Sequence, residues 1–175
     1  MHTIILSGNC FWALQAVFEQ VRGVSEIECG YIWMEAGAPP KPSTIPWPVQ
    51  QMEVIRCQWD PATLSAQDLT RMLLHSTSAG LARWDAIDEL SGMRSLIAQI
   101  PMVFHKDCWE TISEVSVEQG TPLHTQIVSS TLDFKHGSPA DQQFFKDNPQ
   151  NNYSCGIIAP KLQRLRIQFP HLVKS

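Results

Sequence analysis

One cysteine of the chain, Cys10, occupies a setting that favours thiol chemistry. It follows Gly8-Asn9, where a short apolar strand ends and a helix with apolar residues at helical spacing begins. Backbone N–H groups and the positive end of the helix dipole favour an anion there, and a thiolate is such an anion. The position therefore predicts a nucleophilic thiol with a pKa below about 8.5. A small cysteine that only packs at the helix start is the alternative.

The two residues after Cys10 are aromatic. Phe11 belongs to the apolar stripe of the predicted helix, because it is followed by apolar residues at helical spacing. Trp12 projects away from that stripe. We therefore expect the Trp12 ring to form a wall of a pocket beside the sulfur.

A second candidate, Glu53, lies in a segment whose alternation predicts a strand over Gln51 to Trp59. Strand side chains alternate between two faces, so Glu53 shares its face with Ile55, Cys57 and Trp59. A carboxyl group among apolar side chains loses water and keeps its proton more readily, which suits a general acid near neutral pH. A glutamate that reaches solvent, or that pairs with a basic residue, is the alternative.

The other cysteines differ in their surroundings. Cys57 and Cys108 lie on predicted apolar faces and are expected in the core, and Cys29, within a strand, receives no role. Cys155 lies in the polar segment Asn151–Gly156. A thiol on a mobile segment can approach another thiol and resolve an oxidised intermediate by disulfide exchange. An idle thiol is the alternative.

The bulk composition restricts the function further. The chain has 175 residues, 43% hydrophobic and 17% charged, which suits one domain over residues 1–175. With a net charge of -4, the chain lacks the excess of positive charge that favours binding to nucleic acid or to an anionic membrane. No apolar run approaches the roughly 20 residues of a membrane span, and no signal peptide is evident, so we expect reduced thiols in the cytoplasm. Five cysteines and six histidines lack metal-ligand spacing, so no metal is expected.

Strands and helices must position these residues. Periodicity and turn signals predict strands over residues 3–6, 24–33, 51–59, 94–100 and 124–134, and helices over 10–23, 65–73, 104–120 and 139–146. Ala36 to Gln50 is a proline-rich loop, and Pro160 and Pro170 predict an extended C-terminal segment. Without a strict βαβ rhythm, the pattern favours an α+β fold: a two-layer sandwich with a mixed central sheet, ferredoxin-like.

The motifs of the chain resemble those of the A-type methionine sulfoxide reductases, in order and over nearly its whole length. Gly8-Asn9-Cys10-Phe11-Trp12 resembles the family's GGCFW opening. Met52-Glu53-Val54 followed by Trp59-Asp60-Pro61 is similar to its H-A-E-V stretch that ends in YDP or FDP. Asp88 with Arg94-Ser95 matches part of its ND-x-GTQYRSAI segment. Asn148-Pro149, Tyr153 and Ile158-Ala159-Pro160-Lys161 resemble its NP, YC and IAPK elements.

The resemblance implies a role for each matching residue. Cys10 attacks the sulfoxide sulfur, and Glu53 protonates the oxygen and leaves a sulfenic acid on the cysteine. Phe11 and Trp12 hold the S-methyl group, and Asp88 joins them as a substrate-binding residue. The implied fold is a mixed sheet flanked by helices, with no metal or organic cofactor.

Recycling in the family uses a second cysteine, which forms a disulfide that thioredoxin reduces. When the family's C-terminal motif is aligned with this chain without a gap, its recycling cysteine falls on Ser154. Cys155 stands one place later. We expect Cys155 to serve as the resolving thiol, with a thioredoxin-like protein as its reductant.

Some family tyrosines are missing. Met93 replaces the tyrosine of GTQYRS, and Phe144 replaces the tyrosine of the family's HQ-x-Y element. Only Tyr31 and Tyr153 remain in the chain. Because a hydrogen bond to developing charge contributes on the order of 2.7–4 kcal/mol to catalysis, we expect a more apolar pocket with a poorer site for the oxygen.

Three functions are compatible with these residues. One is a thiol reductase of methionine sulfoxide, S epimer, or of a related methyl sulfoxide. The second is a non-catalytic homologue that binds a methyl thioether or a peptide, and the third is a thiol enzyme for acyl or thiol transfer. Cys10 together with Glu53 favours an enzyme, whereas the loss of tyrosines favours binding. The reductase is the function we predict.

Overall fold

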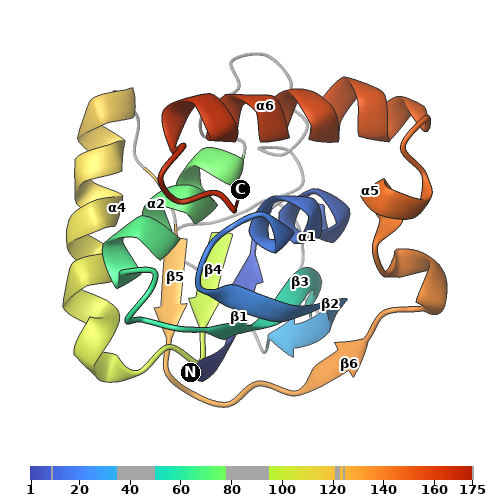
Figure 1. Cartoon of the computed structure of the whole chain (residues 1–175). Helices are drawn as coiled ribbons and strands as arrows, with labels where there is room; N and C mark the ends of the chain where they lie inside the picture. Colours follow the sequence, from blue (N-terminus) through green and yellow to red (C-terminus); the bar gives the residue numbers. More distant parts are fainter. Residues whose placement is uncertain (9, 35–49, 78–94, 121–122, 124, 175) are drawn as a thin grey trace.

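The structure is a computed structural model that describes residues 1–8, 10–34, 50–77, 95–120, 123 and 125–174 (Figure 1). The strands are β1 (His2–Ser7), β2 (Val24–Met34), β3 (Gln50–Trp59), β4 (Ser95–Ala98), β5 (Thr125–Val128) and β6 (Phe134–His136). The helices are α1 (Phe11–Glu19), α2 (Ala66–Ser76), α4 (His105–Gln119), α5 (Phe144–Asp147) and α6 (Ala159–Gln168), with short helical turns η2 (Met102–Phe104), η3 (Pro139–Asp141) and η4 (Ser154–Ile158).

The described strands form one mixed sheet in the order β5-β4-β1-β3-β2-β6. The β4–β5 pair is parallel, and the other pairs are antiparallel. Apolar side chains of α1, α2, α4 and α6 pack with Ile4, Ile55 and Cys57 in one buried cluster, so these helices cover the same face (Figure 1). A smaller cluster around Ile5 and Val54 lies on the opposite face. The predicted α+β fold with a mixed sheet is confirmed.

Local signals explain where several elements begin and end. Helix α2 begins after Ser65, at the start of the helix predicted over 65–73, and the hydroxyl of Ser65 accepts the backbone N–H of Asp68 at 3.0 Å. Helix α4 ends at Gly120, whose φ of 66° lies in the left-handed region that glycine adopts readily. None of the helices in the described ranges is long and apolar enough to cross a membrane.

The last third of the chain differs from the prediction. The strand expected over residues 124–134 is two strands, β5 and β6, which lie at opposite edges of the sheet. Gln143, with a φ of 53°, separates η3 from α5, so the helix expected over 139–146 is interrupted.

The expectation of an extended C-terminal segment was wrong, because η4 and α6 make it helical. Pro160 lies in the first turn of α6, directly after the π-helical turn η4, and its fixed φ suits the helical backbone there. Leu162 and Leu165 bury the inner side of this helix. The predicted loop over Ala36 to Gln50 lies almost entirely outside the described residues.

Candidate active site

Cys10 occupies the start of α1, as predicted. It precedes the first helical residue with extended backbone angles, and its carbonyl oxygen accepts the N–H groups of Ala13 at 3.1 Å and Leu14 at 3.2 Å. Strand β1, which leads to it, lies between β3 and β4 in the sheet. The side chain of Cys10 is partly buried against the helix-covered core.

The carboxylate of Glu53 reaches the same helix start. Its Oε2 accepts the backbone N–H of Phe11 at 3.2 Å. The hydroxyl of Ser7 donates to the carbonyl oxygen of Glu53 at 2.8 Å, which fixes β3 beside the end of β1. The structure thus brings the carboxylate to the residue that follows Cys10, at an unpaired N–H of the helix terminus.

Aromatic rings enclose this helix start. The Trp12 ring stacks on Phe144, with centroids 3.9 Å apart and planes 9° apart, and it meets the edge of Tyr153 at 6.1 Å. Phe11 is 2% exposed and lies 5.4 Å from the ring of Tyr31. Phe11 therefore belongs to the core, as the sequence predicted, and the Trp12 ring packs with Phe144 and Tyr153 in an aromatic cluster beside the helix start.

The pKa of the Cys10 thiol is raised, whereas its position in the sequence predicted a lowered one. Burial is the largest cause, and the charge of Glu53 adds to it. Hydrogen bonds with the side chain of Tyr153 and with the backbone of α1 act in the opposite direction. The helix terminus does favour the thiolate, but desolvation outweighs it in this structure.

A change of Tyr153 tests this balance. The Tyr153 hydrogen bond favours the thiolate, so Tyr153→Phe should raise the pKa of Cys10 further. We expect the midpoint of Cys10 alkylation by iodoacetamide to move to higher pH, with several-fold slower alkylation at pH 7. Peptide mass spectrometry across a pH series measures both. Tyr31→Phe is the matched control and should leave the midpoint in place; an unmoved midpoint in Tyr153→Phe would show that the hydrogen bond is absent in solution.

The two residues at the expected recycling position differ in exposure. Ser154 is 0% exposed, and its hydroxyl has no hydrogen-bond partner among the described residues. Cys155 is exposed, and its thiol donates to the carbonyl oxygen of Pro149 at 3.3 Å. Its N–H donates to the carbonyl oxygen of Asn151 at 2.9 Å. Cys155 thus lies in the π-helical turn η4, which includes the end of the polar segment Asn151–Gly156. For Cys155 to bond Cys10, its thiol must leave Pro149.

The remaining cysteines are buried. Cys57 and Cys108 lie in the core as predicted, 1% and 0% exposed. Cys29 is also 0% exposed, and its thiol donates to the carbonyl oxygen of Phe11 at 3.6 Å. Burial raises the pKa of all three thiols, that of Cys57 to about 12. Thiols of this kind are poor nucleophiles.

Both tyrosines of the chain lie at this site, which the sequence analysis did not predict. Tyr31 stands directly opposite Glu53 in the β2–β3 pair, and Tyr153 hydrogen-bonds Cys10. A count of two tyrosines in 175 residues was the available signal, but their placement depends on contacts between distant segments. Asp88, the predicted substrate-binding residue, and Met93 lie outside the described residues.

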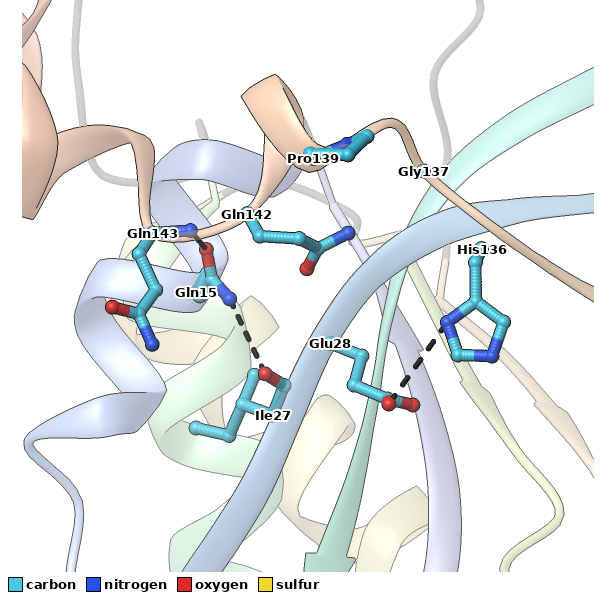
Figure 2. Close-up of a pocket in the computed structure, with 8 residues that line it drawn as sticks. All are labelled: Gln15, Ile27, Glu28, His136, Gly137, Pro139, Gln142 and Gln143. Carbon is cyan, nitrogen blue, oxygen red and sulfur yellow. Dashed lines mark hydrogen bonds and ion pairs between the residues drawn. The ribbon is translucent and has the colours of Figure 1, made fainter.

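A pocket of about 440 Å³ lies further along α1 (Figure 2). Its lining residues are Gln15, Ile27, Glu28, His136, Gly137, Pro139, Gln142 and Gln143. Gln15 donates to the carbonyl oxygen of Ile27 at 3.2 Å and accepts the N–H of Gln143 at 2.6 Å, so its amide is already paired. Cys10 and Glu53 do not line this pocket, and we assign it no part in the reaction. Within the described ranges, no three His, Cys, Asp or Glu side chains are grouped to hold a metal ion.

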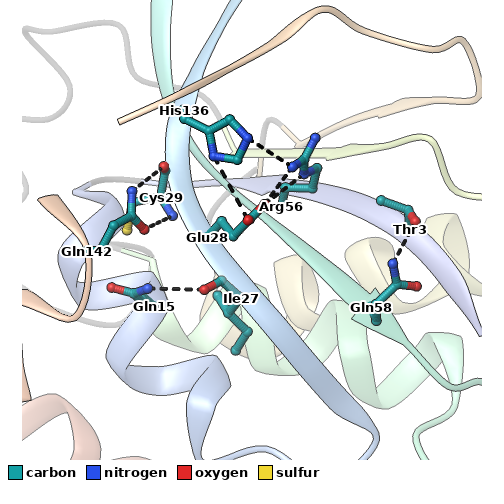
Figure 3. A network of polar contacts seen from close by, with 9 residues as sticks. All are labelled: Thr3, Gln15, Ile27, Glu28, Cys29, Arg56, Gln58, His136 and Gln142. Atoms are coloured by element: carbon teal, nitrogen blue, oxygen red, sulfur yellow. Dashed lines mark hydrogen bonds and ion pairs between the residues drawn. The ribbon is translucent and has the colours of Figure 1, made fainter. Parts of the chain in front are cut away.

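Polar contacts fix strand β2 beside the site (Figure 3). The side-chain amide of Gln142 accepts the N–H of Cys29 at 2.8 Å and donates to its carbonyl oxygen at 2.9 Å. On the opposite face, Arg56 binds the Glu28 carboxylate at 2.6 Å and contacts the His136 ring at 3.3 Å. These contacts hold Cys29, and with it Tyr31 two residues later, at a fixed position opposite β3.

The profile of the family described as peptide methionine sulfoxide reductase matches residues 2–172. The chain belongs to this family. Its members are oxidoreductases that reduce methionine sulfoxide through a thiol, so membership supports the predicted reductase and gives no support to a binding protein.

Individual relatives agree with this assignment. The peptide methionine sulfoxide reductase MsrA of Ralstonia nicotianae is 26% identical over 181 residues, which cover 100% of this chain and 94% of the relative. The MsrA of Trichodesmium erythraeum is 26% identical over 178 residues, 100% of this chain and 99% of the relative. Reduced Mxr1 from Saccharomyces cerevisiae has a TM-score of 0.60 at 18% identity, over 85% of this chain and 86% of that one. Methionine sulfoxide reductase A of Corynebacterium diphtheriae has a TM-score of 0.60 at 15% identity, over 86% of this chain and 76% of that one. The two structures share the fold.

Proposed function

We propose that this reductase acts on the S epimer of methionine sulfoxide, in peptides or as the free amino acid, with Cys10 as nucleophile and Glu53 as proton donor. The observation that carries the proposal is the contact of the Glu53 carboxylate with the N–H of Phe11, one residue from the thiol. A nucleophile and an acid are then on adjacent sides of one small site, as oxygen removal from sulfur requires.

The reaction moves one oxygen atom. The Cys10 sulfur attacks the sulfoxide sulfur while the acid form of Glu53 gives a proton to the oxygen, and the oxygen passes to Cys10. The products are a thioether and a sulfenic acid on Cys10. The proton lost by the thiol returns Glu53 to its acid form, so atoms and electrons balance.

The aromatic rings around Cys10 select the substrate. Trp12 offers apolar surface for the S-methyl group, the buried Phe11 ring lies beside it as the second residue of the predicted methyl site, and the stack of Trp12 on Phe144 holds that surface in place. We include Asp88 in the substrate-binding set on the sequence match alone.

Turnover of a peptide that contains methionine sulfoxide tests this function. One equivalent of the S epimer, added to reduced protein, should yield one equivalent of the methionine peptide, and the intact protein should lose two hydrogens as a disulfide forms. The R epimer is the matched control and should remain unreduced. If neither epimer is converted while Cys10 can still be alkylated, the substrate assignment is wrong.

Cys155 is the thiol that we propose to resolve the sulfenic acid: the S–S bond forms, the S–O bond breaks and water leaves. Its exposure gives a thioredoxin-like reductant access to the disulfide, and five free cysteines fit a cytoplasmic location. Cys155→Ser should complete one turnover and then stop, with one oxygen retained on Cys10. Dimedone trapping and peptide mapping measure this.

Cys108→Ala is the matched control for that experiment, because Cys108 is buried in the core. It should still form the disulfide with Cys155. A bridge from Cys10 to Cys29 or Cys57 in the unaltered protein would remove Cys155 from the mechanism.

A further inference from the structure

We propose that Tyr31 is a further catalytic residue, whose hydroxyl donates a hydrogen bond to the sulfoxide oxygen beside Glu53. The inference rests on the proposed function, since it concerns the oxygen that Glu53 protonates. Met93 and Phe144 replace two tyrosines of the family, and the sequence therefore predicted a poor site for the oxygen. Tyr31 adds a hydrogen-bond donor to that site.

The sheet register places Tyr31 and Glu53 together. They are direct partners in the antiparallel β2–β3 pair, and such partners point to the same face with Cβ atoms about 4.5–5.5 Å apart. Two residues along, the partners Cys29 and Ile55 are both buried under the helices, so this face is the one that α1 covers. Both the phenol and the carboxyl group therefore project from the sheet toward the start of α1.

A second contact ties the Tyr31 ring to the site. The ring lies 5.4 Å from that of Phe11, the residue whose N–H binds the Glu53 carboxylate. Within the described ranges, no hydrogen bond uses the Tyr31 hydroxyl. The hydroxyl of Tyr153, in contrast, is already engaged with Cys10.

The electrostatic surroundings keep Tyr31 a donor. Burial raises the pKa of the Tyr31 phenol, and the charges of Asp141, Glu53 and Cys10 raise it further, so the phenol is protonated at neutral pH. That the charges of Glu53 and Cys10 both act on Tyr31 is consistent with a shared site. A neutral donor aimed at an oxygen that gains negative charge stabilises the transition state more than the ground state.

Removing the hydroxyl tests the proposal in two ways. Tyr31→Phe should slow single-turnover reduction by about 100-fold, the effect of losing one donor to a developing oxyanion. Iodoacetamide alkylation of Cys10 should keep its rate and pH midpoint, because nucleophile and fold are unchanged. A turnover rate within threefold of the unaltered protein would overturn the proposal.

Binding provides a readout that does not depend on turnover. In a Cys10→Ser background, which cannot react, adding Tyr31→Phe should weaken binding of the methionine sulfoxide peptide several-fold and leave binding of the methionine peptide unchanged. Isothermal titration with both peptides measures this. Equal affinities for the sulfoxide with and without the hydroxyl would overturn the role of Tyr31. Failure of the unaltered protein to reduce the sulfoxide would overturn only the proposed function.

Discussion

Serine in place of Cys10 should abolish sulfoxide reduction, with a loss on the order of 10⁴-fold or more, as expected when a catalytic nucleophile is removed. A serine hydroxyl cannot accept the sulfoxide oxygen, because no sulfur remains to be oxidised to a sulfenic acid. The aromatic surface that the substrate contacts at Trp12 is unchanged. Single-turnover assays with the S-sulfoxide peptide give the rate, and titration with the methionine peptide gives the binding.

The same substitution should leave the fold intact. Cys10 precedes α1 and makes no side-chain cap hydrogen bond, whereas serine is among the preferred residues at that position. We expect the free energy of unfolding of Cys10→Ser to equal that of the unaltered protein or to exceed it by up to about 1 kcal/mol. Urea unfolding measures it. Reduction that persists at a tenth of the original rate would mean that another thiol attacks the substrate.

Glu53→Gln should slow formation of the sulfenic acid by about 100-fold to 10⁴-fold, the usual contribution of a positioned general acid. The glutamine oxygen can still accept the N–H of Phe11, so the helix start is retained while the transferable proton is lost. Rapid-quench single turnovers should show the slow step, and binding of the methionine peptide should stay within twofold.

Glu28→Gln is the matched control for this variant. Glu28 lies on the neighbouring strand β2 and pairs with Arg56 on the other face of the sheet. Its replacement should leave the rate of sulfenic acid formation unchanged. If Glu53→Gln and Glu28→Gln behave alike, the proton comes from another group.

The elements that sequence predicts well depend on local signals. The strand around Glu53 follows from alternation, and α2 follows from Ser65 with Asp68. The segment around Pro160 was predicted incorrectly, because a proline is compatible with the first turn of a helix and only packing against the core decides between the two outcomes.

In the candidate site, too, local signals in the sequence identify some residues, and the others depend on contacts between distant segments. Cys10 and Glu53 can be identified from residue type, helix start and strand face. The place of Tyr31 opposite Glu53 cannot, because it depends on the register of β2 against β3, which shifts between Ser25 and Glu28. The raised pKa of the Cys10 thiol also escaped prediction, since it comes from burial against the core, which depends on how distant segments pack.

The side chain of Gln142 has a consequence for self-association. Strand β6 pairs with β2 from Gly30 to Ile32, and the N–H of Gly137 then donates to the carbonyl oxygen of Cys29 at 2.9 Å, so the N–H of Cys29 has no backbone partner from this side. An unpaired strand edge is a template on which another chain can add, and this leads to aggregation. Gln142 accepts that N–H and shares the carbonyl oxygen of Cys29 with Gly137, so it completes the pairing at the point where β6 stops. One amide side chain thus takes the place of a strand residue, and its removal would expose the N–H of Cys29 at the edge of β2.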